Sequence, residues 1–400
     1  MRKKFSVIFI LTAFLLIFGL TVFVGANPLK NSKAELFAKT ESSVEIKSKS
    51  AYLIEPTTGT VIMTQNETER LPIASMCKIM TLLLCYEDID AGNIDFDTEI
   101  TVSENASSMG GSQIFLETNG VYKVGELIKG ITVASANDAC VAMAEKICGS
   151  EDLFVDKMND KALELGMNNT NFANCTGLPK AGQYSCAEDV AKMFSELIKH
   201  KDYFKYSRIW MDEISHPGGR VTEISNTNKL IRFYEGCDGG KTGYTSEAGH
   251  CLCATSIRNG MRLVSVVISS PDSKTRFKEV SSMFNYGFAN FANKMVVNDS
   301  EPLSIKVDVL NGKKDSISVR AEKPVFIFSK KNEQRSVEIN FEPIERVKAP
   351  INKGDVVGKL NVYENGVSIA SVNVISEENV ESMTYFDHLQ DIANNWGLIN

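Results

Sequence analysis

The period of the hydrophobic pattern changes along the chain, and this change limits the possible folds more than any single residue does. Two short runs rich in apolar residues, 51–54 and 60–63, flank a Pro-Thr-Thr-Gly turn and predict a β-hairpin. Apolar residues then recur at helical spacing in four stretches, near residues 73–87, 124–148, 151–165 and 186–199. Strand-like segments return at 249–257 and 262–269 around an Asn-Gly turn, and a helix is expected near 274–294. Strands, helices and strands in this order predict one α/β sandwich domain.

The N-terminus predicts export. Three basic residues precede a nearly unbroken apolar run from Phe5 to Val24, and the run ends in the small-residue pattern Val24-Gly25-Ala26. Such a segment is typical of a secretory signal peptide, here cleaved after Ala26. The run is also long enough to span a bilayer, so an uncleaved membrane anchor is the alternative. In both cases the rest of the chain would be extracytoplasmic.

The second half of the chain ends in a different pattern. From about residue 300, apolar residues alternate in short runs between Gly, Pro and Asn turns, which predicts a small all-β domain. An acidic spacer follows, and the last residues form an amphipathic helical face made of Met383, Phe386, Leu389, Ala393 and Trp396. The predicted division is a signal peptide (1–26), a linker (27–50), a catalytic domain (51–298), a β domain (299–376), and an acidic spacer with an amphipathic tail (377–400).

Composition excludes several classes of function. The chain has 50 acidic and 43 basic residues, a net charge of −7, which argues against binding to a nucleic-acid backbone. Its nine cysteines are an odd number and form no C-x-x-C pair, so neither complete internal pairing nor a structural zinc site is expected. We expect free, buried thiols instead. No metal or organic cofactor is expected.

Ser75 and Lys78 are the first residues that suggest chemistry. A spacing of three at the start of a helix places both side chains on one face. A serine hydroxyl needs a base to attack a carbonyl, and a lysine amine can be that base if burial or a neighbouring charge lowers its pKa. An S-x-x-K quartet alone is weak support, because an ordinary helix N-cap followed by a surface lysine gives the same letters.

Two further elements follow in order, Ser135-Ala136-Asn137 and Lys241-Thr242-Gly243. With S-x-x-K they form the signature of penicillin-binding proteins and class A β-lactamases, although Ala136 replaces the usual central Asp. The sequence resembles the serine D-alanyl-D-alanine carboxypeptidases, the low-molecular-mass penicillin-binding proteins, over roughly residues 50–375. The likeness extends through residues 71–81, 165–172, 226–230 and 238–245. Cys77 stands where the family usually has Thr, and Tyr244 stands where some members have His.

The resemblance implies a fold and a reaction. The fold would be the α+β (α/β) transpeptidase domain of serine β-lactamases and penicillin-binding proteins, an antiparallel sheet with a helical subdomain, followed by a small C-terminal all-β domain. Ser75 would attack the carbonyl between two D-alanines of a peptidoglycan stem peptide, and Lys78 would take its proton. An acyl-enzyme would form and water would cleave it, limiting cross-linking in the cell wall. β-Lactam antibiotics would bind covalently as inhibitors.

The resemblance also assigns roles to the remaining candidate residues. Ser135 would relay a proton to the leaving amine, and Asn137 would hydrogen-bond the substrate backbone. Lys241 and Thr242 would hold the terminal carboxylate, and the Lys241 charge would also help to keep Lys78 neutral. In addition, the main-chain N–H groups of Ser75 and Tyr244 would form the oxyanion hole, and Arg276 is a further candidate partner for the carboxylate.

Other readings are less well supported. Gly240-Lys241-Thr242 ends like a phosphate-binding loop, but position 235 is Glu where that loop requires Gly. The four histidines are scattered and none begins an H-E-x-x-H zinc motif; Cys251 and Cys253 could bind a metal but are better explained as buried apolar residues.

Two alternatives stay open, a β-lactamase and a wall-binding relative that has lost activity. A β-lactamase needs a Glu to activate the deacylating water, and Glu164 comes close to that pattern, although the surrounding residues fit an ordinary helix position. The tail at 383–400 has two acids and no Lys or Arg, so weak membrane association would depend on its apolar residues, and docking onto the β domain is the alternative.

Overall fold

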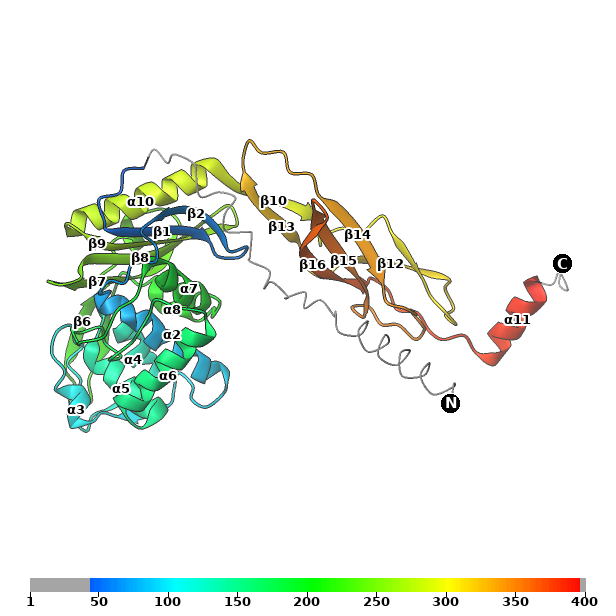
Figure 1. Ribbon diagram of the computed structural model, residues 1–400. Helices are drawn as coiled ribbons and strands as arrows, with labels where there is room; N and C mark the ends of the chain where they lie inside the picture. The colour runs from blue at the N-terminus through cyan, green and yellow to red at the C-terminus, as the bar shows by residue number, and fades with distance from the viewer. Residues whose placement is uncertain (1–43, 396–400) are drawn as a thin grey trace, which may run out of the picture.

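The computed structural model describes residues 44–395 (Figure 1). The predicted signal peptide at 1–26, most of the predicted linker and Trp396 of the predicted tail lie outside the described residues. Within residues 44–395, no helix is both long and apolar enough to cross a membrane.

The strands are β1 (Ser50–Glu55), β2 (Thr60–Gln65), β3 (Glu99–Thr101), β4 (Val121–Lys123), β5 (Met211–Ser215), β6 (Val221–Ser225), β7 (Cys237–Thr245), β8 (Gly249–Arg258), β9 (Met261–Ser270), β10 (Phe291–Val297), β11 (Lys306–Asp308), β12 (Ser316–Ala321), β13 (Val325–Lys330), β14 (Glu338–Pro343), β15 (Val356–Glu364) and β16 (Val367–Ser376). The α-helices are α2 (Lys78–Asp90), α3 (Glu104–Ser107), α4 (Val124–Lys129), α5 (Asn137–Cys148), α6 (Glu151–Glu164), α7 (Ala187–Leu197), α8 (Tyr203–Ser207), α9 (Leu230–Phe233), α10 (Ser273–Asn290) and α11 (Tyr385–Asn395). A 3-10 turn, η1 (Ala74–Cys77), precedes α2, and a π-helical segment, η2 (Gly130–Ala134), precedes α5.

The first domain is built on an antiparallel five-stranded sheet of order β2-β1-β9-β8-β7. Helix α10 covers one face, and the helical half of the domain packs on the other (Figure 1). The chain therefore leaves the sheet after the β1–β2 hairpin, builds the helices, and returns to complete the sheet with β7, β8 and β9. The hydrophobic pattern predicts this return for β8 and β9.

Strand β9 shows why the middle of the sheet is apolar on both faces. Leu263 and Val267 pack in the cluster under α10, whereas Val264, Val266 and Ile268 pack in the cluster that includes α2, α5 and α7. Successive side chains of a strand point to opposite faces, so a strand covered on both sides needs an almost continuous apolar run. The sheet is thus a common wall between two cores.

The C-terminal part is all β, as predicted. Strands β11, β12, β16, β15 and β14 form one sheet in this order, and β10 pairs with β13. Its own apolar cluster is separate from the two cores of the first domain. The stacked rings of Phe291 and Phe328, 5.1 Å apart, extend the cluster under α10 towards β13. Figure 1 shows this part as an elongated body that separates the first domain from α11.

Three sequence-based expectations about local structure are wrong. The helix expected over 124–148 is interrupted by η2 and by the left-handed Ser135 (φ 64°). The helix expected to reach 294 ends at Asn290, because the next residues pair as β10 with β13, so the β part begins before the expected boundary at 298. Residues 44–49 are not a free linker: Val44 and Ile46 pack on the α10 side of the sheet, and the Lys47 and Ser48 main-chain N–H groups bond to Glu279.

The tail forms α11, and its apolar side chains are exposed rather than docked. Tyr385 and Phe386 have 73% and 79% of their surface accessible, and Leu389 and Ile392 are exposed too. These side chains therefore do not dock onto the β domain, which was the alternative expected from the sequence.

Candidate active site

Ser75 and Lys78 are placed by the turn that leads into the first long helix. Ser75 lies in η1, and Lys78 is the first residue of α2. In a 3-10 turn, side chains three residues apart are nearly eclipsed. The Lys78 Nζ atom accordingly donates a hydrogen bond to the Ser75 Oγ atom over 3.1 Å, and a second one to the Thr176 carbonyl.

The turn that carries Ser75 is held in an unusual conformation by two close backbones. Ala74 has a positive φ of 48°, which is rare for a residue with a side chain. A Cβ atom at Gly177 would lie 2.0 Å from the Ala74 carbonyl oxygen, and one at Gly243 would lie 2.7 Å from the Ile73 carbonyl oxygen. Both glycines are therefore needed for the chain to approach Ser75 so closely.

The break between η2 and α5 sets the positions of Ser135 and Asn137. The left-handed turn at Ser135 aims its hydroxyl at β7, where the Lys241 Nζ atom donates a hydrogen bond to Ser135 Oγ over 2.6 Å. The Asn137 side-chain amide donates to the Gly110 carbonyl over 2.7 Å. The buried Asp138 carboxylate accepts the main-chain N–H groups of Ile114 and Leu116. The 110–116 loop is thereby fixed beside Asn137.

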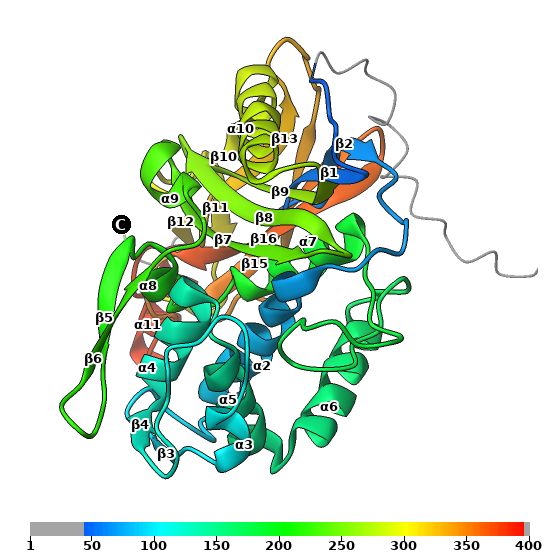
Figure 2. The same cartoon turned by 90° about the vertical axis from the view of Figure 1, so that its left-hand side faces the viewer.

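Lys241, Thr242 and Tyr244 lie on β7, the edge strand of the sheet next to the helices (Figure 2). Lys241 and Thr242 are buried, whereas Tyr244 is 60% exposed and stacks on His250 at a ring distance of 4.4 Å. The Gly240 N–H donates to the Tyr203 hydroxyl rather than to β8. N–H groups of alternate strand residues point to the same edge, so the N–H groups of Thr242 and Tyr244 point to the open edge.

The four side chains thus form two hydrogen-bonded pairs, Lys78 with Ser75 and Lys241 with Ser135. Both amines are buried, and within residues 44–395 no carboxylate lies within ion-pair distance of either one. Burial lowers the pKa of Lys78 below its ordinary 10.5, although nearby thiols, that of Cys140 foremost, partly oppose this. Burial lowers the pKa of Lys241 further, and the Lys78 charge adds to the effect.

The two buried amines also influence each other's protonation. From the sequence we expected the Lys241 charge to keep Lys78 neutral. Burial is the main cause of the lowered pKa of Lys78, and the Lys78 charge disfavours protonation of Lys241. Because this repulsion is mutual, a charge on Lys241 disfavours a proton on Lys78 in the same way. A buried pair of amines without a carboxylate cannot easily hold two protons, because like charges repel strongly in a low-dielectric site.

Arg276 reaches β7 from α10, and its guanidinium bonds to main-chain carbonyls of β7 and β8. Its Nη1 atom donates to the carbonyls of Gly243 and Cys251, over 2.9 and 3.1 Å, and its buried Nε atom has no hydrogen-bond partner within the described part of the chain. The guanidinium braces the β7–β8 pair next to Tyr244. The Nη2 atom donates a longer hydrogen bond, 3.4 Å, to the Ser273 hydroxyl.

A loop at 173–178 completes the floor of the site, and sequence reasoning missed it. The Asn174 Oδ1 atom accepts the N–H groups of Thr176 and Gly177, and the Gln183 Oε1 atom accepts those of Ala173 and Asn174. These bonds hold the Thr176 carbonyl that Lys78 uses. No residue type signals a main-chain carbonyl, although an Asn followed three residues later by a Gly, as at Asn174 and Gly177, is typical of a tight turn.

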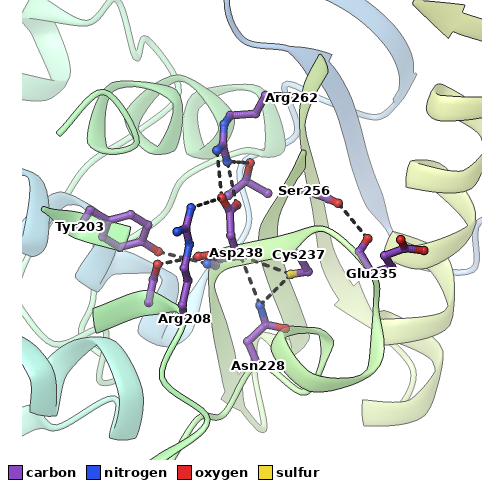
Figure 3. Close-up of polar contacts among 12 residues, drawn as sticks. Tyr203, Arg208, Asn228, Glu235, Cys237, Asp238, Ser256 and Arg262 are labelled. Atoms are coloured by element: carbon purple, nitrogen blue, oxygen red, sulfur yellow. Dashed lines mark hydrogen bonds and ion pairs between the residues drawn. The ribbon is translucent and has the colours of Figure 1, made fainter. Parts of the chain in front are cut away.

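A second set of missed residues fixes the start of β7 (Figure 3). The buried Asp238 carboxylate forms a two-point contact with Arg262, 2.7 and 2.9 Å, and a weaker one with Arg208. The Asn228 side chain donates to the Gly239 carbonyl, and the Tyr203 hydroxyl accepts the Gly240 N–H. Asn228 and Asp238 lie in segments that carry the family resemblance, but no role was expected for either residue from the sequence.

Other candidate residues lie away from this cluster. Glu164 ends α6, is mostly exposed and forms an ion pair with Lys161 on the surface. The nine cysteines all lie in the described part and are unpaired, and Cys251 and Cys253 are fully buried. Among the described residues, no group of His, Cys, Asp and Glu could hold a metal ion.

Comparisons with known proteins agree with this geometry. The profile of the family described as D-alanyl-D-alanine carboxypeptidase matches residues 37–272, and that of the penicillin-binding protein 5 C-terminal domain matches residues 291–382. The chain is 40% identical over 359 residues to D-alanyl-D-alanine carboxypeptidase DacF of Bacillus subtilis (strain 168), covering 90% of this chain and 92% of that protein. It is 30% identical over 377 residues to DacC of Escherichia coli (strain K12), covering 90% and 92%.

Solved structures give the same result. A crystal structure of PBP3 from Streptococcus pneumoniae, described as a peptidoglycan synthesis regulatory factor, superposes with a TM-score of 0.71 at 27% identity, covering 84% of this chain and 100% of that one. The D-alanyl-D-alanine carboxypeptidase DacD from Francisella tularensis has a TM-score of 0.63 at 28% identity, covering 90% and 100%. The predicted fold class is confirmed.

Proposed function

The chain belongs to the family of D-alanyl-D-alanine carboxypeptidases, which are serine hydrolases, and from this premise we propose that it is exported and removes the terminal D-alanine from peptidoglycan stem peptides through a Ser75 acyl-enzyme. The observation that carries this proposal is the pair of hydrogen bonds from Lys78 to Ser75 and from Lys241 to Ser135. All three family motifs contribute to these two pairs: two side chains from the first motif and one from each of the others.

Acylation begins with the Ser75 hydroxyl. Its oxygen attacks the carbonyl carbon between the two D-alanines, and its proton passes to the neutral Lys78 amine, 3.1 Å away. The carbon–nitrogen bond then breaks. The leaving amine receives a proton through the Ser135 hydroxyl, and the terminal D-alanine departs. Hydrolysis of the Ser75 ester by water releases the shortened stem and restores the enzyme.

The oxyanion that forms during attack needs fixed donors. The Tyr244 N–H points to the open edge of β7, and the Gly243 backbone next to it lies against the turn that carries Ser75. The Ser75 and Tyr244 N–H groups would stabilise the developing charge, and losing one such donor typically costs a factor of 100 or more in rate. Asn137, held by its bond to Gly110, would align the substrate backbone.

Substrate binding can set the protonation state that catalysis needs. The substrate carboxylate would bind Lys241 and Thr242, with Arg276 contributing from behind β7. A carboxylate beside Lys241 favours the charged form of that amine, and the charged Lys241 then disfavours a proton on Lys78. Lys78 would therefore be neutral when the substrate is present. The coupling expected from the sequence would operate in the complex.

The direct test is release of D-alanine from a peptide that ends in Lys-D-Ala-D-Ala, with the protein spanning residues 27–400. We expect release by the wild type and by the control Ser371→Ala, a substitution on β16, but none by Ser75→Ala. Release by Ser75→Ala at the wild-type rate would refute the assignment of the nucleophile. Failure of the folded wild type would favour an inactive wall-binding relative.

The β-lactamase alternative has no support at the site. Its deacylating Glu would have to reach the Ser75 ester, whereas Glu164 is a surface residue paired with Lys161. We therefore propose that β-lactams acylate Ser75 and are released slowly. A labelled penicillin should remain on the wild type after gel filtration, and rapid loss of the label would contradict the proposal.

The N-terminal segment and the tail suggest where the enzyme works. We propose that residues 1–26 direct export and that α11 holds the enzyme weakly at a membrane through the exposed Tyr385, Phe386, Leu389 and Ile392. The β domain would keep the active site away from this anchor. Removing residues 383–400 should move the protein from the membrane fraction to the soluble fraction; an unchanged distribution would refute the anchor.

A further inference from the structure

The order of functional groups along β7 gives the substrate a direction. Lys241 and Thr242, the proposed carboxylate partners, come first, and Tyr244, whose N–H would face the scissile carbonyl, comes next. A strand advances about 3.3 Å per residue, so the leaving D-alanine and the attacked carbonyl would occupy successive positions along this edge. The part of the stem that stays on Ser75 must then continue beyond Tyr244, towards Thr245 and the turn that follows.

A shallow pocket lies at that end of the edge, directly beside the turn that carries Ser75. Its walls come from η1, from the loop after Gly177 and from the β7–β8 turn, and they include Ala74, Leu178, Pro179, Lys180, Thr245 and Glu247. No part of the proposed reaction uses this pocket. Its position matches the stem residue that precedes the two D-alanines.

The walls of the pocket are fixed in place. The Leu178 carbonyl accepts hydrogen bonds from both Asn174 and Gln183, and the Lys180 carbonyl accepts the Gln183 N–H. On the opposite wall, the Ala248 N–H donates to the Thr245 hydroxyl across the turn that carries Glu247. Rigid walls can select a ligand, because little ordering is needed on binding.

The pocket carries two opposite charges that are not used elsewhere. Lys180 and Glu247 are exposed, are the only ionisable residues of its lining, and have no ion-pair partner within the described residues. We propose that this pocket binds the side chain of the stem residue before the two D-alanines and favours one that ends in both an ammonium and a carboxylate. Glu247 would accept the ammonium, and Lys180 would pair with the carboxylate. The inference rests on the proposed function.

The test compares three acetylated peptides X-D-Ala-D-Ala that differ only at X, which is meso-diaminopimelate, lysine or norleucine. The first has both charges, the second has the ammonium alone, and the third has neither. Exposed ion pairs are individually weak, so we expect each correctly placed charge to raise kcat/KM by about two- to fivefold. The expected order is diaminopimelate above lysine above norleucine, and the differences should shrink in high salt.

Two variants separate the two charges. Lys180→Met should abolish the preference for diaminopimelate over lysine. Glu247→Gln should bring the lysine peptide close to norleucine and reduce, but not abolish, the advantage of diaminopimelate over norleucine, because Lys180 still pairs with its carboxylate. Turnover of the norleucine peptide should stay within twofold of the wild type in both. Lys201→Met and Glu235→Gln are matched controls, because they remove exposed charges of the same domain outside the pocket, and they should leave all three values unchanged.

The outcomes distinguish this inference from the function on which it rests. Equal kcat/KM for the three peptides, or preferences that keep their wild-type size in both pocket variants, would overturn the charge-selective pocket while leaving the carboxypeptidase intact. No D-alanine release from any peptide would overturn the proposed function, and the pocket assignment with it. The predicted order, lost selectively in the two variants, would support the inference.

Discussion

Replacing Gly177 with alanine should inactivate the enzyme by moving Ser75, without touching any side chain of the site. A Cβ atom at this position would lie 2.0 Å from the Ala74 carbonyl oxygen and 2.9 Å from the Ser75 nitrogen. Real Cβ atoms essentially never approach closer than 3.0 Å, so one of the two backbones must shift by about 1 Å. Both neighbours are main chain, and neither can rotate away as a flexible side chain would.

The expected magnitude follows from two contributions. Gly177 has a φ of 82°, and a left-handed alanine costs about 1–2 kcal/mol of stability. A displacement of about 1 Å at the reacting atoms can lower the rate by about 100-fold. We therefore expect a moderate loss of stability and a loss of kcat/KM of about 100-fold or more.

Gly182→Ala is the matched control for this variant. Gly182 lies in the same loop region with nearly the same φ, 84°, but its added Cβ would meet only the Asn171 side chain, at 3.9 Å. It should show the same conformational cost and keep near-normal activity. The assay pairs thermal unfolding with D-alanine release and with acylation by a labelled penicillin. Equal activity in the two variants would refute the argument, because only Gly177 presses on the turn that carries Ser75.

Three further outcomes follow from the buried charges. Activity should increase with pH as Lys78 loses its proton, with a midpoint below pH 10.5, and a flat pH profile of kcat/KM between pH 5 and 10 would contradict Lys78 as the base. Because the pKa of Lys241 is lowered in the fold, the unfolded chain binds more protons from that lowered value up to 10.5, and stability should rise with pH there. Lys241→Met should therefore raise the unfolding temperature at pH 7 while abolishing turnover, and a lower unfolding temperature would refute the reasoning. Asp238→Asn should cost about 2–5 kcal/mol of stability, measured by denaturant unfolding, because it leaves Arg262 without its carboxylate; an unchanged midpoint would show that the pair contributes little.

The sequence predicted the first hairpin and the middle of the sheet, because their patterns are local. Strands β8 and β9 are rich in apolar residues that pack on both faces, and the Asn259-Gly260 turn between them is a strong signal. Strand β7 was not predicted. It contains three glycines, Gly239, Gly240 and Gly243, which have low strand propensity. A side chain at Gly243 would collide with the turn that carries Ser75, whereas at Gly239 it would meet Tyr203 and at Gly240 the backbone of β8.

The sequence predicted which residue types form the site, but it did not predict the groups that hold those residues in place. Spacing alone placed Ser75 and Lys78 on one side of the chain, and the structure adds a hydrogen bond between them. The break at Ser135 gave no signal, since no Gly or Pro marks it and the apolar period continues through it. The Thr176 carbonyl and the Asp238–Arg262 pair depend on chain segments that meet only in the folded protein.

The nine unpaired thiols make an exported form of this protein depend on how slowly it unfolds. Seven are buried, and burial raises the pKa of groups such as Cys140, to about 12, so the folded chain offers few thiolates to an oxidant. An unfolded molecule exposes all of them, and mispaired disulfides would then trap it before it could refold. Its lifetime in an oxidising environment would therefore be set by its rate of unfolding rather than by its free energy of unfolding. A reducing agent should make its thermal transition reversible.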